Sequence, residues 1–176
     1  MISDLREAWH RFRKHTWLAL AFDVAVLVGV FFAIHAWQTR HLPDDELAPA
    51  TELSLLDGGR QNAFRAGAPG IVYFFAPWCR VCRLSIGNLD DLVEKGRVEW
   101  ATVVALDYSD ADEVREFIES SEVTLPVLLG TAQTAADWSV RAFPTYYVID
   151  SAGRIQSRSV GYSTWLGMWA RSAWAP

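Results

Sequence analysis

The chain has few of the residues that build metal centres or bind nucleic acids. Only two of its 176 residues are cysteines, Cys79 and Cys82, and all four histidines lie within the first 41 positions. Beyond residue 43 the only lysine is Lys95. A structural zinc site needs four ligands, so we expect neither a metal nor any other cofactor at the cysteine pair. The formal net charge of −5 argues against nucleic acid as a partner.

One long apolar run is present, at residues 17–37, and it contains only Asp23 and His35 as polar positions. As a helix it is about 31 Å long, enough to cross the bilayer core. Tryptophans stand at both ends, where interfacial aromatics are favoured. Four basic residues precede the run and one follows it closely, so the positive-inside rule keeps the N-terminus in the cytoplasm. We therefore expect a cytoplasmic segment 1–16, a transmembrane anchor 17–37 in the lipid bilayer, a linker 38–51 and a main domain 52–176 outside.

A cleaved signal peptide is the alternative interpretation of this run. Its apolar region would be shorter and would end at small residues, whereas His35 and Trp37 make a poor cleavage site. Asp23 needs an explanation, because a carboxyl group inside a membrane span is costly and often functional. Two explanations remain open. Asp23 lies about two turns from the N-terminal end, where water access lowers that cost, or it marks a contact between helices.

The cysteine pair follows a segment that is typical of a buried strand. Residues 71–75 are apolar and rich in β-branched and aromatic side chains, and Pro77 ends the run. A helix then begins near Cys79 or Arg80, as shown by apolar residues at helical spacing: Cys82, Ile86, Leu89 and Val93. The Cys79 sulfur would lie beside unpaired backbone N–H groups and the positive end of the helix dipole. Both favour the thiolate, and Arg80 adds a cation that lowers the pKa further.

Three chemistries are open to two cysteines at this spacing. Cys82 can reach back to resolve a mixed disulfide on Cys79, which makes the pair redox-active. A purely structural disulfide closes too short a loop to gain much chain entropy. A Cu(I) carrier remains an alternative, since soft sulfur suits that ion, although Pro77 and Trp78 are bulky and no methionine or histidine is adjacent.

Two segments together resemble the signatures of the thioredoxin superfamily. Residues 78–82 follow the apolar strand, and residues 140–150 contain Phe143 and Pro144. In that family the second segment carries a cis proline that faces the cysteines, which implies a cis Phe143–Pro144 bond here. The resemblance implies that Trp78, Phe143 and Pro144 bind substrate, with the backbone of Phe143 pairing with an extended chain.

The stretch between the signatures is longer than in plain thioredoxin, and residues 123–129 are similar to the extra strand of the membrane-anchored TlpA/ResA-like branch. Residues 161–167 are similar to the copper-tolerance members. The resemblance covers about residue 53 to the C-terminus. It implies an α/β, thioredoxin-like three-layer fold with a mixed sheet and a central αβ insertion, preceded by one transmembrane helix.

The resemblance also implies a function. The chain would be an enzyme, a membrane-tethered thiol:disulfide oxidoreductase that reduces exported protein disulfides through Cys79 and Cys82. Its electrons would come from a membrane thiol donor such as a DsbD-like reductant. Its place would be the bacterial inner membrane, as a single-pass protein with the catalytic domain in the periplasm.

Several positions depart from the family pattern. Thioredoxin has a buried aspartate where this chain has Tyr73, and ResA-like members often carry a glutamate where it has Ser85. Gly87 replaces a proline that kinks the active-site helix, and Ala76 stands where a peroxidase has threonine. These changes leave exchange chemistry intact but leave open how Cys82 is deprotonated.

The remaining pattern predicts the order of elements in the main domain. The C-terminal helix, with Ser163 as its expected N-cap, carries Trp165, Leu166 and Trp169, which either cover the sheet, the interpretation we favour, or face a membrane. The other expected elements are a strand at 52–56 with a turn at 57–59, a helix from 79 to about 95, a strand at 100–106, a helix at 110–121, a strand at 125–129, a helix at 135–138 and a hairpin of 145–149 with 154–160.

Overall fold

The computed structural model describes residues 2–43 and 45–173, so the outermost residues of the expected segments 1–16 and 52–176 lie outside the described part. The chain divides into two compact units, Met1–Arg40 and His41–Pro176. We describe each unit by itself.

The first unit is one helix, α1 (Ile2–Thr39). It contains a stretch, Trp17–Thr39, that is long and apolar enough to cross a membrane, with a mean hydropathy of 2.4. Its large apolar side chains are exposed, for example Phe22 at 68%. The helix is longer than the predicted span of 17–37, because no proline precedes Pro43 to interrupt it.

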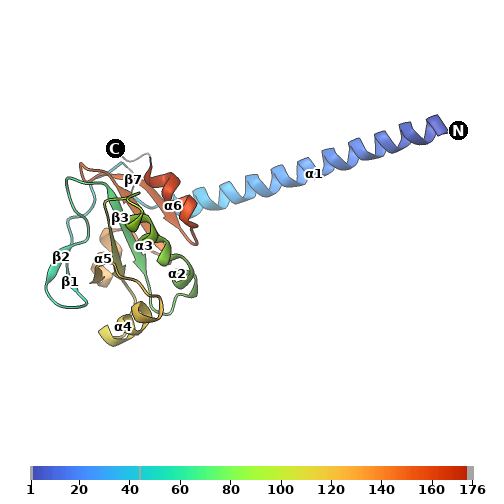
Figure 1. Cartoon of the computed structure of the whole chain (residues 1–176). Coiled ribbons are helices and arrows are strands. Elements are labelled where there is room, and N and C mark those ends of the chain that lie inside the picture. Colours follow the sequence, from blue (N-terminus) through green and yellow to red (C-terminus); the bar gives the residue numbers. More distant parts are fainter. Residues whose placement is uncertain (1, 44, 174–176) are drawn as a thin grey trace. The chain divides into compact units, whose positions relative to one another are not determined.

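The second unit is built on a seven-stranded mixed sheet in the order β2-β1-β5-β4-β3-β6-β7 (Figure 1). Strand β3 is central and pairs in parallel with β4 and antiparallel with β6. Strand β5 lies between β4 and β1, so the predicted inserted strand is an interior strand. The strands are β1 (Glu52–Leu55), β2 (Arg60–Asn62), β3 (Gly70–Phe75), β4 (Trp100–Ala105), β5 (Val127–Leu129), β6 (Thr145–Ile149) and β7 (Ile155–Val160).

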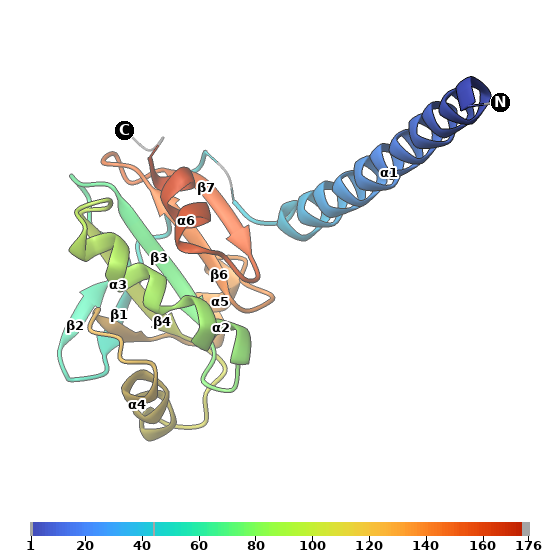
Figure 2. The same ribbon diagram turned by 45° about the vertical axis from the view of Figure 1, so that its right-hand side comes forward.

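Helices cover both faces of this sheet, which gives the three predicted layers (Figure 2). Alternate residues of β3 divide between two cores, because successive side chains of a strand point to opposite faces. Tyr73 belongs to the core that holds both cysteines, and Phe74 to the core around Trp138. The first core is covered by α2 (Arg80–Ser85), α3 (Gly87–Glu94), α4 (Ala111–Ser120) and α6 (Trp165–Ser172), and the second by α5 (Ala132–Asp137) and the segment after α1.

The single helix predicted from residue 79 to about 95 is interrupted. Helix α2 ends at Ser85 and α3 starts at Gly87, with Ile86 between them. The backbone N of Leu89 bonds to the Ile86 carbonyl, three residues back, instead of continuing the α-helical pattern. Glycine weakens a helix interior, and Gly87 lies directly after the break, so a proline is not needed to interrupt the helix here.

Two further predictions about helix starts are wrong. Thr164, not Ser163, is the N-cap of α6, and its side chain accepts a hydrogen bond from the backbone N of Gly167. Helix α5 begins at Ala132 rather than near residue 135, because Thr131 and Thr134 form a capping box. The pattern was missed since threonine stands where a capping box usually has glutamate or glutamine.

The tryptophans of α6 partly cover the sheet, as the favoured interpretation predicted. Trp165 and Trp169 stack on each other with centroids 6.2 Å apart and pack against the core that holds the cysteines. Lys95 lies over the Trp165 ring, 5.4 Å from its centroid, and Arg97 lies over the Trp169 ring at 5.9 Å.

Candidate active site

The cysteine pair lies at the start of α2, where the sequence placed it. Cys79 is the N-cap residue, and its Sγ accepts a hydrogen bond from the backbone N of Cys82 at 3.1 Å. A disulfide joins the two residues, whose Cα atoms are 5.3 Å apart. Cys79 is 6% exposed, whereas Cys82 is wholly buried. A partner can therefore reach the sulfur of Cys79 more easily than that of Cys82.

A buried hydrogen bond ties the helix of the cysteines to the central strand. The Tyr73 hydroxyl of β3 lies 2.8 Å from Ser85 Oγ of α2, and both residues are wholly buried. Ser85 Oγ donates its single hydrogen to the Val81 carbonyl at 3.2 Å, so Tyr73 is the donor to Ser85. The two residues that replace acidic groups of the family thus satisfy each other without a charge.

The environment of Tyr73 keeps its hydroxyl neutral. Burial raises the pKa of Tyr73 well above its ordinary value; the hydrogen bond with Ser85 opposes this rise, and Tyr146 adds to it. The rings of Tyr73 and Tyr146 are stacked, with centroids 6.4 Å apart. Tyr146 in turn accepts a hydrogen bond from Arg171 of α6 at 3.0 Å.

Trp78, directly before Cys79, is 59% exposed but held in place. Its Nε1 donates to both the carbonyl oxygen and Oδ2 of Asp107, each at 3.1 Å. Its ring meets Phe143 edge-on, with centroids 5.7 Å apart. Two of the predicted substrate-binding side chains, Trp78 and Phe143, are therefore in contact next to the disulfide.

The predicted cis bond between Phe143 and Pro144 is present. Two hydrogen bonds fix the backbone around it. Thr145 Oγ1 donates to the Ala142 carbonyl at 2.8 Å, and the backbone N of Gly161 donates to the Pro144 carbonyl at 2.8 Å.

A groove of about 520 Å³ opens beside Trp78 and Phe143. We call it the lateral groove. Gly130 lies in its wall, and a Cβ there would come within 2.7 Å of Leu106 Cδ2, so only glycine leaves this backbone in place. The wall consists of residues 106–108 after β4, residues 130–132 after β5, Ala135 of α5 and Phe143.

Asp107 was missed by the sequence reasoning, although a signal was available. It follows the buried strand β4, which runs parallel to β3, and the carboxyl ends of neighbouring parallel strands meet at one edge. A carboxylate at that position is therefore expected near the residues that follow β3, among them Trp78.

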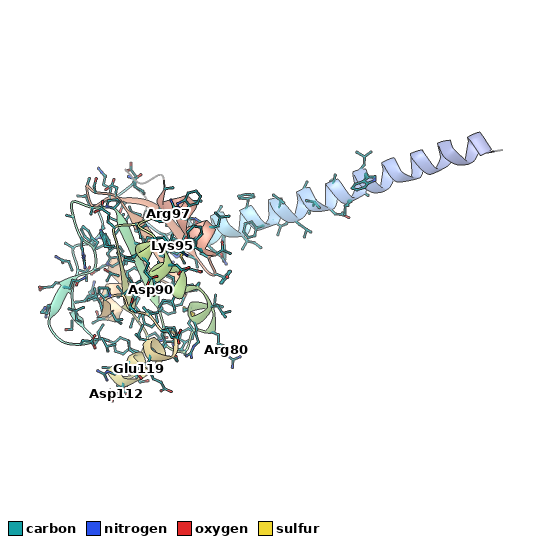
Figure 3. The ribbon with its side chains drawn as sticks, viewed as in Figure 1. Arg80, Asp90, Lys95, Arg97, Asp112 and Glu119 are labelled. Carbon is teal, nitrogen blue, oxygen red and sulfur yellow. A yellow bond between two sulfur atoms is a disulfide. The ribbon has the colours of Figure 1, made fainter. Side chains whose placement is uncertain are left out.

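Arg80 does not join the other predicted site residues. Its side chain is exposed and extends away from the folded domain (Figure 3). The influence of Arg80 on the Cys79 thiolate stays a prediction, whereas the helix-start position of Cys79 is a feature of the structure.

Comparisons with known proteins agree with this geometry. The model of the AhpC/TSA family matches residues 45–158. The thioredoxin-like protein YneN of Bacillus subtilis is 30% identical over 128 residues, which cover 70% of this chain and 75% of that protein. The thiol:disulfide interchange protein DsbE of Pseudomonas aeruginosa is 28% identical over 159 residues, covering 84% of this chain and 86% of that protein.

Among solved structures, a thiol:disulfide interchange protein of the thioredoxin family from Chlorobium tepidum has a TM-score of 0.66 with this chain. The match covers 76% of this chain and 97% of that one, at 20% sequence identity. At this identity the likeness concerns the fold, which is thioredoxin-like as predicted.

Proposed function

The chain belongs to the AhpC/TSA family of thioredoxin-like proteins, and from that membership we propose that it is a membrane-tethered reductase of exported protein disulfides. The resemblance to the TlpA/ResA-like branch is confirmed by its relatives. The broader class, thiol–disulfide oxidoreductase, is also confirmed. The tether, the direction of electron flow and the roles of individual residues are the proposal.

The observation that carries the proposal is the unequal exposure of two cysteine residues at one helix start. Cys79 lies at the N-cap of α2, where the backbone N–H of Cys82 points at its sulfur. That N–H and the helix dipole stabilise a thiolate once the disulfide is reduced. We assign Cys79 as the nucleophile and the buried Cys82 as the resolving thiol.

The exchange proceeds in two steps. The Cys79 thiolate attacks one sulfur of the substrate disulfide, that S–S bond breaks, and the other substrate sulfur leaves as a thiolate that takes up a proton. Cys82 then loses its proton and attacks Cys79 Sγ, which releases the second substrate thiol and closes the Cys79–Cys82 disulfide. The substrate gains two electrons and two protons, and a membrane dithiol donor of the DsbD-like kind returns them to the cysteine pair.

Trp78, Phe143 and Pro144 are proposed to bind the substrate chain. The edge-on contact between Trp78 and Phe143 forms an aromatic wall beside the sulfurs. The backbone of Phe143 would pair with an extended substrate, the mode in which a chain adds as a strand.

Helix α1 is proposed to be the membrane anchor. Its apolar side chains are exposed over the stretch Trp17–Thr39, which suits a lipid environment. The basic residues before this stretch favour an N-terminus in the cytoplasm and a domain in the periplasm, as in a bacterial inner-membrane protein. The Cu(I) carrier receives no support from the site, since an ion held by both sulfurs would need access to Cys82, which is wholly buried.

Trapping experiments test the assignment of the two cysteines. The full chain with Cys82→Ser should accumulate mixed disulfides with partner proteins, because the resolving thiol is gone. Cys79→Ser should accumulate none above background. The opposite pattern would reverse the two roles.

The direction of electron flow is tested by the midpoint potential of the cysteine pair in a glutathione series. A value near that of thioredoxin, about −270 mV, supports a reductase. A value near that of DsbA, about −120 mV, would make the protein an oxidant and contradict the proposal.

A further inference from the structure

The lateral groove lies on the far side of Trp78 from the sequence position of Cys79 and has no role in the exchange steps. Trp78 connects the two places, because it adjoins Cys79 in sequence and contacts both Asp107 and Phe143 of the groove wall. A substrate chain with one cysteine at Cys79 can therefore continue into the groove. An extended chain advances about 3.3 Å per residue, so the groove would receive residues a few positions from the substrate cysteine.

The size and wall of the groove suit an apolar side chain. Its volume of about 520 Å³ falls within the range of roughly 300–1,000 Å³ that is typical of pockets for small ligands. Leu106, Ala132, Ala135 and Phe143 supply apolar surface. Burying one leucine-sized side chain there favours binding by more than about tenfold.

One carboxylate, Asp107, belongs to the wall, and two more, Asp110 and Glu113, follow it within six residues of sequence. Asp107 Oδ2 accepts the Trp78 N–H, Asp110 Oδ1 accepts the backbone N of Glu113, and Glu113 Oε2 accepts the backbone N of Ser109. These donors are neutral, so they hold the carboxylates without cancelling their charge. Within the described side chains, no ion pair involves any of the three, and Arg115 of the same region pairs with Asp112.

We propose that the lateral groove selects substrates in which an apolar residue and a lysine or arginine flank the reactive cysteine. The apolar side chain enters the groove, and the cation lies beside Asp107 at its edge. Complementary charge is the reason to name a basic segment as the occupant, because Asp107 in the groove wall has no cationic partner among the described side chains. The inference rests on the proposed reductase function and adds the substrate class.

The test compares disulfide peptides that differ only beside one cysteine. One carries leucine and lysine, a second leucine and glutamate, and a third glycine and lysine. The reduced full chain, in an uncharged detergent, is mixed with each peptide, and each exchange rate is divided by the rate with bis(2-hydroxyethyl) disulfide. The leucine–lysine peptide should react about threefold to tenfold faster than the leucine–glutamate peptide, as expected for exposed charge pairs. The preference should fall in about 1 M salt.

Two variants distinguish the effect of the local Asp107 charge on the peptide preference from the effect of the protein's net charge. Asp107→Asn keeps an oxygen that can accept the Trp78 N–H but removes the charge, so the lysine preference should fall at least twofold. Glu119→Gln changes the net charge equally at an exposed position on the surface of α4 (Figure 3) and should leave the preference unchanged. Equal rates for the lysine and glutamate peptides, or equal effects of the two variants, would overturn the proposal.

A binding measurement separates this proposal from the proposed function. Fluorescent peptides with serine in place of both cysteines are titrated with the full chain, and anisotropy is followed. Tighter binding of the leucine–lysine peptide without any exchange would support the groove and refute the reductase. Exchange without a preference among the peptides would refute the groove and support the reductase. Absence of both would refute both.

Discussion

The buried pair Tyr73–Ser85 gives a sharp prediction about stability. Tyr73→Phe removes the donor of the 2.8 Å hydrogen bond but leaves Ser85 bonded to the Val81 carbonyl. No buried polar group loses its last partner, so the cost should be about 0.5–1.5 kcal/mol of unfolding free energy. Ser85→Ala removes the acceptor and leaves a buried tyrosine hydroxyl without a partner, which costs about 1–3 kcal/mol. Alanine has a better helix propensity than serine, which reduces this loss of unfolding free energy by about 0.5 kcal/mol.

The double variant distinguishes this account from simple loss of packing. With both hydroxyls gone, no buried polar group is left unsatisfied, and replacement of both partners by apolar groups is close to neutral. Adding Tyr73→Phe to Ser85→Ala should therefore restore stability. The coupling between the two sites should be about 1 kcal/mol or more, which is within the range for residues in contact.

The assay is urea unfolding of the full chain in detergent, followed by circular dichroism, for the native chain, both single variants and the double variant. All four chains are measured in the oxidised state, so that the disulfide is constant. A double variant less stable than Ser85→Ala, or strictly additive losses, would refute the reasoning about the hydrogen bond.

Three further outcomes are expected. Burial raises the pKa of Tyr73 and of Tyr147 in the folded chain. Keeping these hydroxyls neutral therefore costs no folding free energy below the unfolded-state pKa of about 10, but stability falls as pH rises above that pKa, where the unfolded chain loses the protons first. In Tyr73→Phe this alkaline loss of stability should be smaller. Gly130→Ala should lower the melting temperature by several degrees, at a cost of about 1–3 kcal/mol, because its Cβ would come within 2.7 Å of Leu106; an unchanged value would contradict this. Protease added outside spheroplasts should remove the main domain and leave residues 1–16 protected, and a domain that resists until lysis would refute the topology.

The sequence predicted the layers of the fold well, because each strand and helix has its own hydrophobic pattern that can be recognised without knowing the rest of the structure. The buried strands β3 and β4 are continuous apolar runs, and α4 has apolar residues at helical spacing with Asp110 as its cap. The errors lie at element ends. The break between α2 and α3 and the early start of α5 depend on local hydrogen bonds that composition does not specify.

The sequence predicted only those parts of the site that lie within the two sequence signatures, residues 78–82 and 140–150. Cys79, Cys82, Trp78 and the cis Phe143–Pro144 bond were expected from two segments of sequence. The lateral groove and Asp107 were not, because they arise where the ends of β4 and β5 meet Phe143 in space. The contact between Tyr73 and Ser85 could not be predicted either, because it joins a strand and a helix that meet only in the folded chain.

The hydrogen bond between Tyr73 and Ser85 bears on which group accepts the Cys82 proton. Neither hydroxyl is a base for the Cys82 proton, because both are neutral: burial raises the pKa of Tyr73, and Ser85 keeps its hydrogen in the bond to the Val81 carbonyl. Asp90 of α3 has one buried oxygen, Oδ2, but lies eight residues after Cys82, about 12 Å by helix rise. Among the described residues, the only acidic residue that is buried as a whole is Asp150, at the opposite end of β3 and about 20 Å away by strand geometry. Its oxygens are bound by the backbone N of Arg154 and by Gln156. With no wholly buried carboxylate near Cys82 among the described residues, we expect its proton to pass to water or to the substrate sulfur that leaves, so the resolving step depends on how the substrate is held.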